Sequence, residues 1–376
     1  MFNKFAVDIT RPFNLAGLDG LRAIAILLVL FHHAWEYTGV SQFGKSVTSI
    51  LKLGWVGVDI FFVLSGFLIC AVLLQARGQQ KFFSTFYFRR MFRIFPLYYA
   101  CLAILGLAAV LILVSNRPLP PALSDVDKIW VNVFYLTNIF MAFQGFDWAF
   151  FRPTWTLALE EQFYLIFPLL VFFLAPKKLF LTLAGIVVAS PMIRLFALEI
   201  TGSQDFVALF PLCRFDGFAA GALCALIVHN KTEIRTPYLL PTMLLSGFGA
   251  AFLLLFAYRS DLTFIAFGYT SIYVFFAGLI YIMCKFNPKS WSFLSAKPMT
   301  MVGHLSYSLY LLHMLVRGGL DGLIKWDLTS IPIVILRMLA IVMVSLAVAH
   351  LSFRYFEQPI RIKGYRWIKS KSVQTK

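Results

Sequence analysis

Charged side chains are scarce in this sequence. Asp, Glu, Lys and Arg make up 13% of its 376 residues, about half of the share in an average soluble protein. Hydrophobic residues account for 60%, and 41 residues are phenylalanine. So little charge cannot cover the surface of a soluble protein of this length, and the composition therefore predicts a polytopic membrane protein.

Acidic residues are the scarcer charge type, with 17 Asp and Glu against 33 Lys and Arg and a formal net charge of +16. The basic residues lie between apolar segments and do not alternate with stacking aromatics in a soluble domain. This arrangement argues against nucleic acid as a partner. The positive excess is instead typical of the cytoplasmic loops of a membrane protein.

Cysteine is also rare, and its placement argues against two further kinds of site. The five cysteines are isolated and lie mostly within apolar segments, without the Cys-x-x-Cys or His spacing of a zinc site. They are Cys70, Cys101, Cys213, Cys224 and Cys284. We expect neither a disulfide framework nor a metal site, and no permanently bound cofactor.

Long apolar segments predict the architecture. A helix needs about 20 residues to cross a bilayer, and we identify ten candidate segments: 18–37, 56–74, 95–114, 155–174, 179–198, 210–228, 238–257, 262–284, 301–316 and 331–353. We predict an all-α membrane helix bundle of about ten transmembrane helices, in which residues 1–376 form a single domain. No signal-peptide cleavage site follows the first segment, so we expect that helix to remain in the mature protein.

An eleventh apolar segment, 129–145, decides the topology. Basic residues cluster in 1–16, 75–93, 176–178, 229–235, 285–297 and 354–376, and the positive-inside rule places such clusters in the cytoplasm. A crossing at 129–145 would invert every later loop, including the basic tail at 360–376. We therefore predict a re-entrant or interfacial helix at 129–145 on the outer side, with both termini cytoplasmic.

The first apolar segment carries ionisable groups. Arg22 and His33 are eleven residues apart, so on a helix they lie within about 20° of one face and about 16 Å apart along the axis. His32 lies about 100° away. An ionisable side chain within a bilayer costs about 2.5–3.5 kcal/mol on insertion scales and is a functional hypothesis by default. The structural alternative is that His33 hydrogen-bonds to a neighbouring helix.

Helix geometry places other polar residues at the depth of His33 or nearer the outer boundary. Counted from the ends of their segments, these residues are Glu160, Glu161, His313, Asp59, Arg214 and Asp216. These polar residues at similar depths predict a polar, water-accessible cavity in the outer half of the bundle. Two structural alternatives are a core role for His313 and an ion pair between Arg214 and Asp216.

A basic segment marks the opposite side. Arg89 and Arg90 lie four and three residues before Arg93 among Phe and Tyr residues, just before the chain enters the membrane at Pro96. Arginine binds phosphate through two hydrogen bonds, and neighbouring aromatic rings can stack on a base. The segment predicts a site for a phosphorylated ligand at the cytoplasmic mouth. The alternative is an anchor for anionic lipid.

Seven sequence blocks carry a family resemblance. They are Leu18-Asp-Gly-Leu-Arg-Ala-Ile-Ala followed by His33, Gly57-Val-Asp-Ile-Phe-Phe-Val-Leu-Ser-Gly-Phe-Leu-Ile, Arg89-Arg-Met-Phe-Arg-Ile-Phe-Pro, Trp155-Thr-Leu-Ala-Leu-Glu-Glu-Gln-Phe-Tyr, Arg214-Phe-Asp-Gly-Phe, Leu305-Ser-Tyr-Ser-Leu-Tyr-Leu-Leu-His and Phe356-Glu-Gln-Pro. From about Leu15 to Pro359 the chain resembles the acyltransferase 3 family of integral membrane acyltransferases. We see no sign of the esterase-like domain that is fused to some members.

The resemblance implies a function. Members generally move acetyl or another short acyl group from cytoplasmic acyl-CoA to hydroxyls of sugars in surface polysaccharides and related glycans. By this resemblance we expect acyl-CoA, a glycan or lipid-linked sugar and membrane lipids as partners, in a bacterial-type inner membrane. The competing hypothesis is a secondary transporter or flippase of an acylated sugar or lipid, although the two related halves typical of transporters are not visible.

The resemblance and the residue chemistry together suggest roles. A thioester is already activated, so the enzyme must orient a hydroxyl and remove its proton. We expect His33 to be the general base or a transient acyl carrier, oriented by Glu161 or Glu160. The donor set is Arg22, Arg89, Arg90 and Arg93. The acceptor-side or charge-balancing set is Asp59, Trp155, Tyr164, Arg214, Asp216 and His313.

Overall fold

A computed structural model describes residues 16–120, 123–146, 151–231, 236–256, 261–285 and 291–373. All regular structure in these residues is helical, which confirms the predicted all-α class. Predictions about residues 1–15 and 374–376, including the position of both chain ends, fall outside the described residues.

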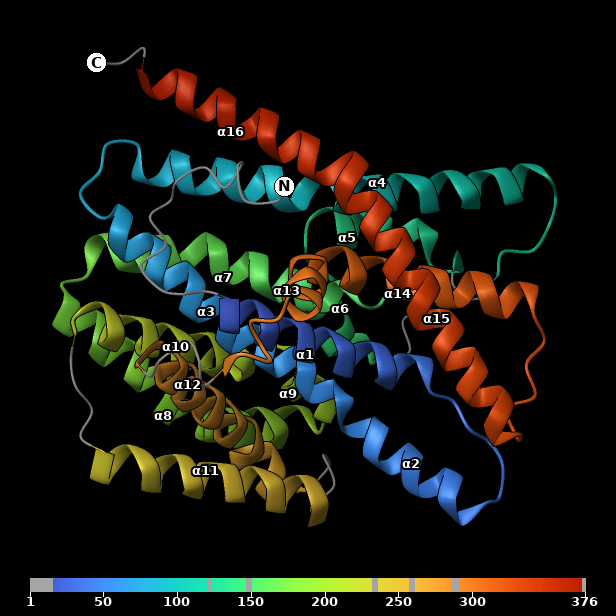
Figure 1. The fold of residues 1–376 in the computed structure, drawn as a ribbon, viewed down its shortest axis with the longest axis horizontal. Coiled ribbons are helices and arrows are strands. Elements are labelled where there is room, and N and C mark those ends of the chain that lie inside the picture. Colours follow the sequence, from blue (N-terminus) through green and yellow to red (C-terminus); the bar gives the residue numbers. More distant parts are fainter. Residues whose placement is uncertain are drawn as a thin grey trace. The chain divides into compact units, whose positions relative to one another are not determined.

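The chain forms two compact units, which we call unit 1 and unit 2. Unit 1 comprises Met1–Phe61, Phe88–Leu97 and Lys285–Lys376, and unit 2 comprises Phe62–Tyr87 and Tyr98–Cys284. Two helices contribute to both units, α3 (Val56–Ala76) and α4 (Phe82–Val114). The ribbon in Figure 1 follows the chain through both units.

Unit 1 contains the first helix and the C-terminal helices. Its elements are α1 (Ala16–Ala34), α2 (Gln42–Lys52), the short 3₁₀ turn η1 (Leu53–Trp55), α13 (Lys297–His304), α14 (Ser306–Leu323), α15 (Ile331–Ser352), the π-helical turn η6 (Phe353–Glu357) and α16 (Gln358–Val373).

Unit 2 contains the middle of the chain. Its elements are α5 (Ile129–Val133), α6 (Thr137–Gln144), α7 (Thr154–Phe173), α8 (Pro176–Thr201), α9 (Gln204–Leu209), α10 (Pro211–His229), α11 (Thr236–Phe256), the π-helical turn η4 (Phe264–Gly268) and α12 (Tyr269–Lys285).

Eight helical segments among the described residues are long and apolar enough to cross a membrane. They are Gly17–Ala34, Gln42–Ala76, Phe82–Val114, Thr154–Phe173, Pro176–Thr201, Gln204–His229, Phe264–Lys285 and Ile331–Ile368. The predicted polytopic helix bundle is therefore confirmed. The number of ten spans stays a prediction, because α11 contributes only the shorter apolar segment Leu240–Ala251 and α14 does not qualify.

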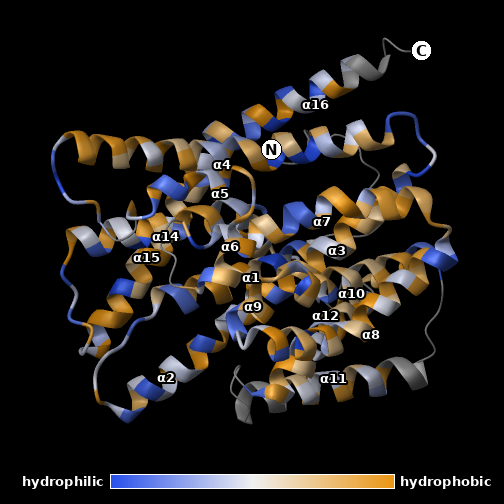
Figure 2. Ribbon diagram, turned by 180° about the vertical axis from the view of Figure 1, so that it is seen from behind, coloured by the Kyte–Doolittle hydropathy of each residue, from blue (hydrophilic) through white to orange (hydrophobic). Residues whose placement is uncertain are grey.

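Two predicted segments have different limits in the structure. The segment 301–316 is interrupted, because α13 ends at His304 and α14 begins at Ser306. The helix that contains the last predicted span does not end near 353: α15, η6 and α16 continue one another to Val373, and Figure 1 shows this long helical run in red. The basic residues at 360–368 thus lie on a helix, which alternates between hydrophilic and hydrophobic colours in Figure 2.

The segment 129–145 contains two short helices. The 5 residues of α5 and the 8 residues of α6 extend about 8 and 12 Å, far less than a bilayer core of about 30 Å. In unit 2, Nη2 of Arg77 donates to the main-chain oxygen of Leu174 at 2.7 Å, so the ends of α3 and α7 meet. Helix ends that meet lie on the same side of the membrane, so the chain between them must cross the membrane an even number of times. Because α4 and α7 supply two, this contact supports the prediction that 129–145 does not cross.

Close backbone packing aligns α1 with α13 in unit 1. A Cβ atom at Gly303 would overlap the main-chain oxygen of Asp19, so only glycine permits this approach. Beside it, Nε2 of His304 lies 3.2 Å from Oδ2 of Asp19. This contact places the start of α1 beside α13, and α14 then follows α1 towards His33.

Reporter fusions test the topology. If 129–145 does not cross, a reporter inserted after Gly78 and one inserted after Lys177 should report the same side of the membrane, and the basic flanks predict the cytoplasmic side. Phosphatase and fluorescent-protein reporters at both positions provide the measurement. Signals from opposite sides would show that 129–145 crosses.

Candidate active site

Two histidines from helices far apart in the sequence meet in unit 1. Nδ1 of His33 on α1 lies 3.1 Å from Nε2 of His313 on α14. Nδ1 of His313 lies 3.0 Å from the main-chain oxygen of Leu309 and 2.8 Å from that of Tyr310. His313 is buried, whereas His33 is partly exposed. The structure thus brings together two residues that the sequence predicted at a similar depth.

These contacts determine which nitrogens carry hydrogen. Carbonyl oxygens only accept hydrogen bonds, so Nδ1 of His313 must be its N–H donor. In a neutral imidazole the other nitrogen is then an acceptor, and Nδ1 of His33 must donate to Nε2 of His313. The lone pair of His33 therefore resides on Nε2. This nitrogen has the form required of a general base or a nucleophile.

Arg317 fixes the backbone at His33. Its Nη1 donates to the main-chain oxygen of His33 at 2.8 Å, and its Nη2 donates to Oε2 of Glu36 at 2.6 Å. Its Nε lies 3.4 Å from Oδ2 of Asp321, one turn further along α14. The guanidinium thus joins the end of α1 to α14.

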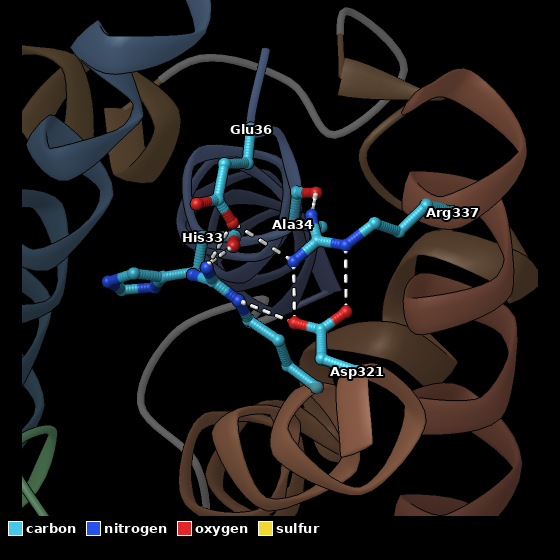
Figure 3. Close-up of polar contacts among 6 residues, drawn as sticks. His33, Ala34, Glu36, Asp321 and Arg337 are labelled. Atoms are coloured by element: carbon cyan, nitrogen blue, oxygen red, sulfur yellow. Dashed lines mark hydrogen bonds and ion pairs between the residues drawn. The ribbon is translucent and has the colours of Figure 1, made fainter. Parts of the chain in front are cut away.

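Arg337 on α15 holds the next residue of α1. Its Nη1 donates to the main-chain oxygen of Ala34 at 2.9 Å, and its Nε and Nη2 form a two-pronged pair with Asp321 at 2.8 and 2.6 Å. Nη2 also lies 3.2 Å from Oε2 of Glu36. Figure 3 shows this cluster beside the end of α1, with the His33 ring directed away from it. We call Glu36, Arg317, Asp321 and Arg337 the charge clamp.

His32 has a different environment from His33. Its Nδ1 lies 3.2 Å from the main-chain oxygen of Leu51 at the end of α2. Nearby, Nε1 of Trp35 donates to the hydroxyl of Thr48 at 2.8 Å. These contacts tie α2 to α1, so His32 has a structural partner rather than one on α14.

A carboxylate sits at the other end of α14. Oε1 of Glu357 accepts hydrogen bonds from the hydroxyls of Ser308 at 2.6 Å and Ser352 at 2.9 Å. The charges of Arg361 and Arg93 also act on this carboxylate. Ser308 and His313 are five residues apart on α14, which is about 7.5 Å along its axis. One helix therefore connects the histidine pair to this second cluster.

The predicted donor residues lie in unit 1. Arg22 is near the start of α1, eleven residues before His33, and Arg89, Arg90 and Arg93 follow one another on α4. The hydroxyl of Tyr307 donates to the main-chain oxygen of Ile94 at 2.6 Å, which ties this part of α4 to the start of α14.

Glu160 has hydroxyl partners within unit 2. Its Oε1 accepts from Ser65 at 3.1 Å and its Oε2 accepts from Tyr164 at 2.9 Å. Glu161 is the next residue of α7. The residue at Nδ1 of His33 is His313 rather than a carboxylate, and a pairing of His33 with Glu160 or Glu161 stays a prediction.

The alternative of an Arg214–Asp216 ion pair is corrected by the structure. Oδ2 of Asp216 pairs with Nη1 of Arg194 on α8 at 2.9 Å and accepts from the hydroxyl of Thr270 at 2.6 Å. Residues two apart on a helix do not face each other. Arg214 instead lies over the ring of Tyr269, 3.9 Å from its centre.

The remaining acceptor-side candidates belong to different units. The ring of Trp155 lies 6.2 Å from that of Phe62 within unit 2, and Asp59 is fully buried on the part of α3 that belongs to unit 1.

Sequence reasoning missed several charged residues that the structure shows in contact. They are Glu36, Arg194, Arg317, Asp321, Arg337, Glu357 and Arg361. One signal was present: Arg317 and Asp321 are four residues apart, the spacing of facing charges on a helix. Glu357 belongs to the Phe356-Glu-Gln-Pro block, which carries the family resemblance but does not by itself indicate the contacts of this carboxylate.

Comparison with known proteins agrees with this architecture. The acyltransferase 3 family model, described as an acyltransferase domain, matches residues 15–351. The O-acetyltransferases OatA of Staphylococcus aureus strains NCTC 8325 and COL are each 29% identical over 94% of this chain. A further protein of strain COL is 26% identical over 93% of the chain.

The match covers only part of these relatives, because the chain spans 58% of their length. No solved structure matches the chain. The family match nevertheless extends over most of the sequence, from the first described helix to α15. The chain belongs to the acyltransferase 3 family and is an integral membrane protein.

Proposed function

We propose that this protein transfers an acetyl or another short acyl group from an acyl-CoA to a sugar hydroxyl of a cell-surface or exported glycan. The family supports acyl transfer over the transport hypothesis, and the OatA relatives are O-acetyltransferases by name. The observation that carries the role of His33 is its contact with His313, because that contact leaves Nε2 of His33 as the basic nitrogen.

The proposed reaction begins at Nε2 of His33. The acceptor hydroxyl gives its proton to this nitrogen as its oxygen attacks the thioester carbon. The tetrahedral intermediate then collapses, the carbon–sulfur bond breaks, and the thiolate leaves with the proton from the imidazolium. General base catalysis of this kind contributes about 10²–10⁴-fold. In a relay through the enzyme, the same nitrogen is the atom that becomes acylated.

The other proposed roles divide between binding of the donor and binding of the acceptor. Arg22, Arg89, Arg90 and Arg93 bind the acyl-CoA at the cytoplasmic face of a bacterial-type inner membrane. The glycan or lipid-linked sugar approaches from the opposite face. Glu161 or Glu160 is the proposed carboxylate that orients His33. The proposed acceptor-side or charge-balancing residues are Asp59, Trp155, Tyr164, Arg214, Asp216 and His313.

A transfer assay tests the function. Purified protein in lipid is incubated with labelled acetyl-CoA and a panel of polysaccharides and lipid-linked sugars, and label bound covalently to the glycan is counted. Label that crosses the membrane without becoming attached would favour the transport hypothesis.

Substitution of the two adjacent histidines separates catalysis from packing. His33→Ala should reduce transfer by about 10²-fold or more because the base is lost. His32→Ala should retain a substantial part, since it removes only a contact to α2. A lost polar contact between membrane helices costs about 0.6 kcal/mol on average, too little to unfold the protein. Rates are measured per monodisperse molecule; a folded His33 variant with a near-parental rate would contradict the assignment.

A second substitution tests the tautomer set by His313. His313→Ala should lower kcat by about 10–100-fold, the usual cost of losing a group that orients a functional imidazole. His313→Gln should recover part of the rate, because its amide oxygen can accept from Nδ1 of His33. Equal damage by both substitutions would indicate a packing role alone.

The charge clamp should be strongly coupled. Arg337→Leu and Asp321→Leu each leave a charge without its main partner, a change that costs about 3–5 kcal/mol for fully buried pairs and less here because Asp321 is 31% exposed. The double variant should be more stable than the sum of the single effects predicts. The exposed Lys128–Asp125 pair is the matched control and should show little coupling. Melting in detergent is the measurement, and additive single effects would argue against the pairing.

A further inference from the structure

Helix α16 packs directly on the basic part of α4 in unit 1. The ring of Trp367 lies 5.2 Å from that of Phe88 and 6.3 Å from that of Phe92, centre to centre. A Cβ atom at Gly364 would overlap the Phe92 ring, so the backbone of α16 lies against this side chain. Two helices that are distant in the sequence therefore form one surface.

This surface is strongly positive. The whole of α4 contains no acidic residue, and neither does α16. Their basic residues on this surface are Arg89, Arg90, Arg93, Arg361 and Arg366. The carboxylate that joins them is Glu357, at the end of η6. Such an imbalance favours an anionic ligand.

The charges converge at Glu357. Its carboxylate accepts hydrogen bonds from Ser308 and Ser352, and both Arg93 and Arg361 act on it electrostatically. One carboxylate carries a single negative charge, whereas two guanidinium groups carry two positive charges. Glu357 therefore lies within electrostatic reach of one arginine of α4 and one of α16.

We propose that α16 forms a second wall of the donor site and that Arg361 binds a phosphate group of the donor together with Arg93. This inference rests on the proposed acyl-CoA-dependent function. Guanidinium groups bind phosphate through paired, charge-assisted hydrogen bonds. The rings of Phe88 and Trp367 are 36% and 44% exposed and offer faces on which a nucleotide base can stack.

The position suits a donor that has a phosphorylated end and a reactive end. Glu357 is held by Ser308 on α14, and His313 lies about 7.5 Å further along the same helix. A phosphate at Arg361 leaves the flexible arm of coenzyme A to carry the thioester towards His33. Anchoring the remote end raises the effective concentration of the reacting group.

Lipid headgroups share the phosphate chemistry, so the test must separate the two sources. Parent protein, Arg361→Gln and Lys363→Gln are placed in nanodiscs of phosphatidylcholine alone, and coenzyme A binding is titrated calorimetrically. Lys363 lies about 200° around α16 from Arg361, so its substitution removes the same charge from the opposite face. Arg361→Lys keeps the charge without the paired hydrogen bonds, and a sizing column verifies that each variant is folded.

The expected result is a loss of about tenfold or more in coenzyme A affinity for Arg361→Gln, a change within about twofold for Lys363→Gln, and an intermediate value for Arg361→Lys. Equal affinities of Arg361→Gln and Lys363→Gln would overturn the inference and leave the proposed donor intact. The same variants are also compared in nanodiscs that contain phosphatidylglycerol. If Arg361→Gln lowers the retention of this lipid but leaves coenzyme A affinity unchanged, the site binds lipid and the inference is overturned. Absence of coenzyme A binding by the parent would contradict the proposed function itself.

Discussion

The carbonyl end of α1 is the constraint on which the candidate site depends. The last carbonyl groups of a helix have no partners within that helix, so donors from elsewhere must satisfy them. Arg317 and Arg337 donate to the oxygens of His33 and Ala34. Their charges must then be balanced, and Glu36 and Asp321 do so. Satisfying two carbonyls thus requires four charged side chains, which bind α1 to α14 and α15.

Helix α14 connects the hydrogen bonds at Glu357 to the histidine pair in unit 1. Ser308 near its start bonds to Glu357, and His313 in its middle contacts His33. Arg317 and Asp321 follow at intervals of four residues, so they share a face with His313. A shift of α14 would therefore move the histidine pair, the charge clamp and the partner of Glu357 together. Under the proposed function, this shared element aligns the donor at one end with the base at the other.

The sequence predicted the elements better than their contacts. Apolar length identified the long helices, and the positive-inside rule was enough to argue that 129–145 does not cross. Counting residues from the ends of their segments predicted a similar membrane depth for His33 and His313, because both lie on regular helices. It could not identify Arg337, since Ala34 and Arg337 are 303 residues apart and periodicity does not reveal which helices are neighbours. Nearness in sequence was misleading at Asp216, whose partner Arg194 lies on another helix.

The charge clamp restricts the rotation of α1 about its axis more than it stabilises the fold. Apolar side chains of similar volume often replace a buried ion pair without loss of stability, and they would hold α1, α14 and α15 together as well. They could not donate hydrogen bonds to the oxygens of His33 and Ala34, however, and the rotation of α1 about its axis would then be less restricted. A rotation of about 100° would bring His32 to the place of His33. Because the guanidinium groups hold successive carbonyls of α1 against two different helices, they determine which of the two adjacent histidines faces His313.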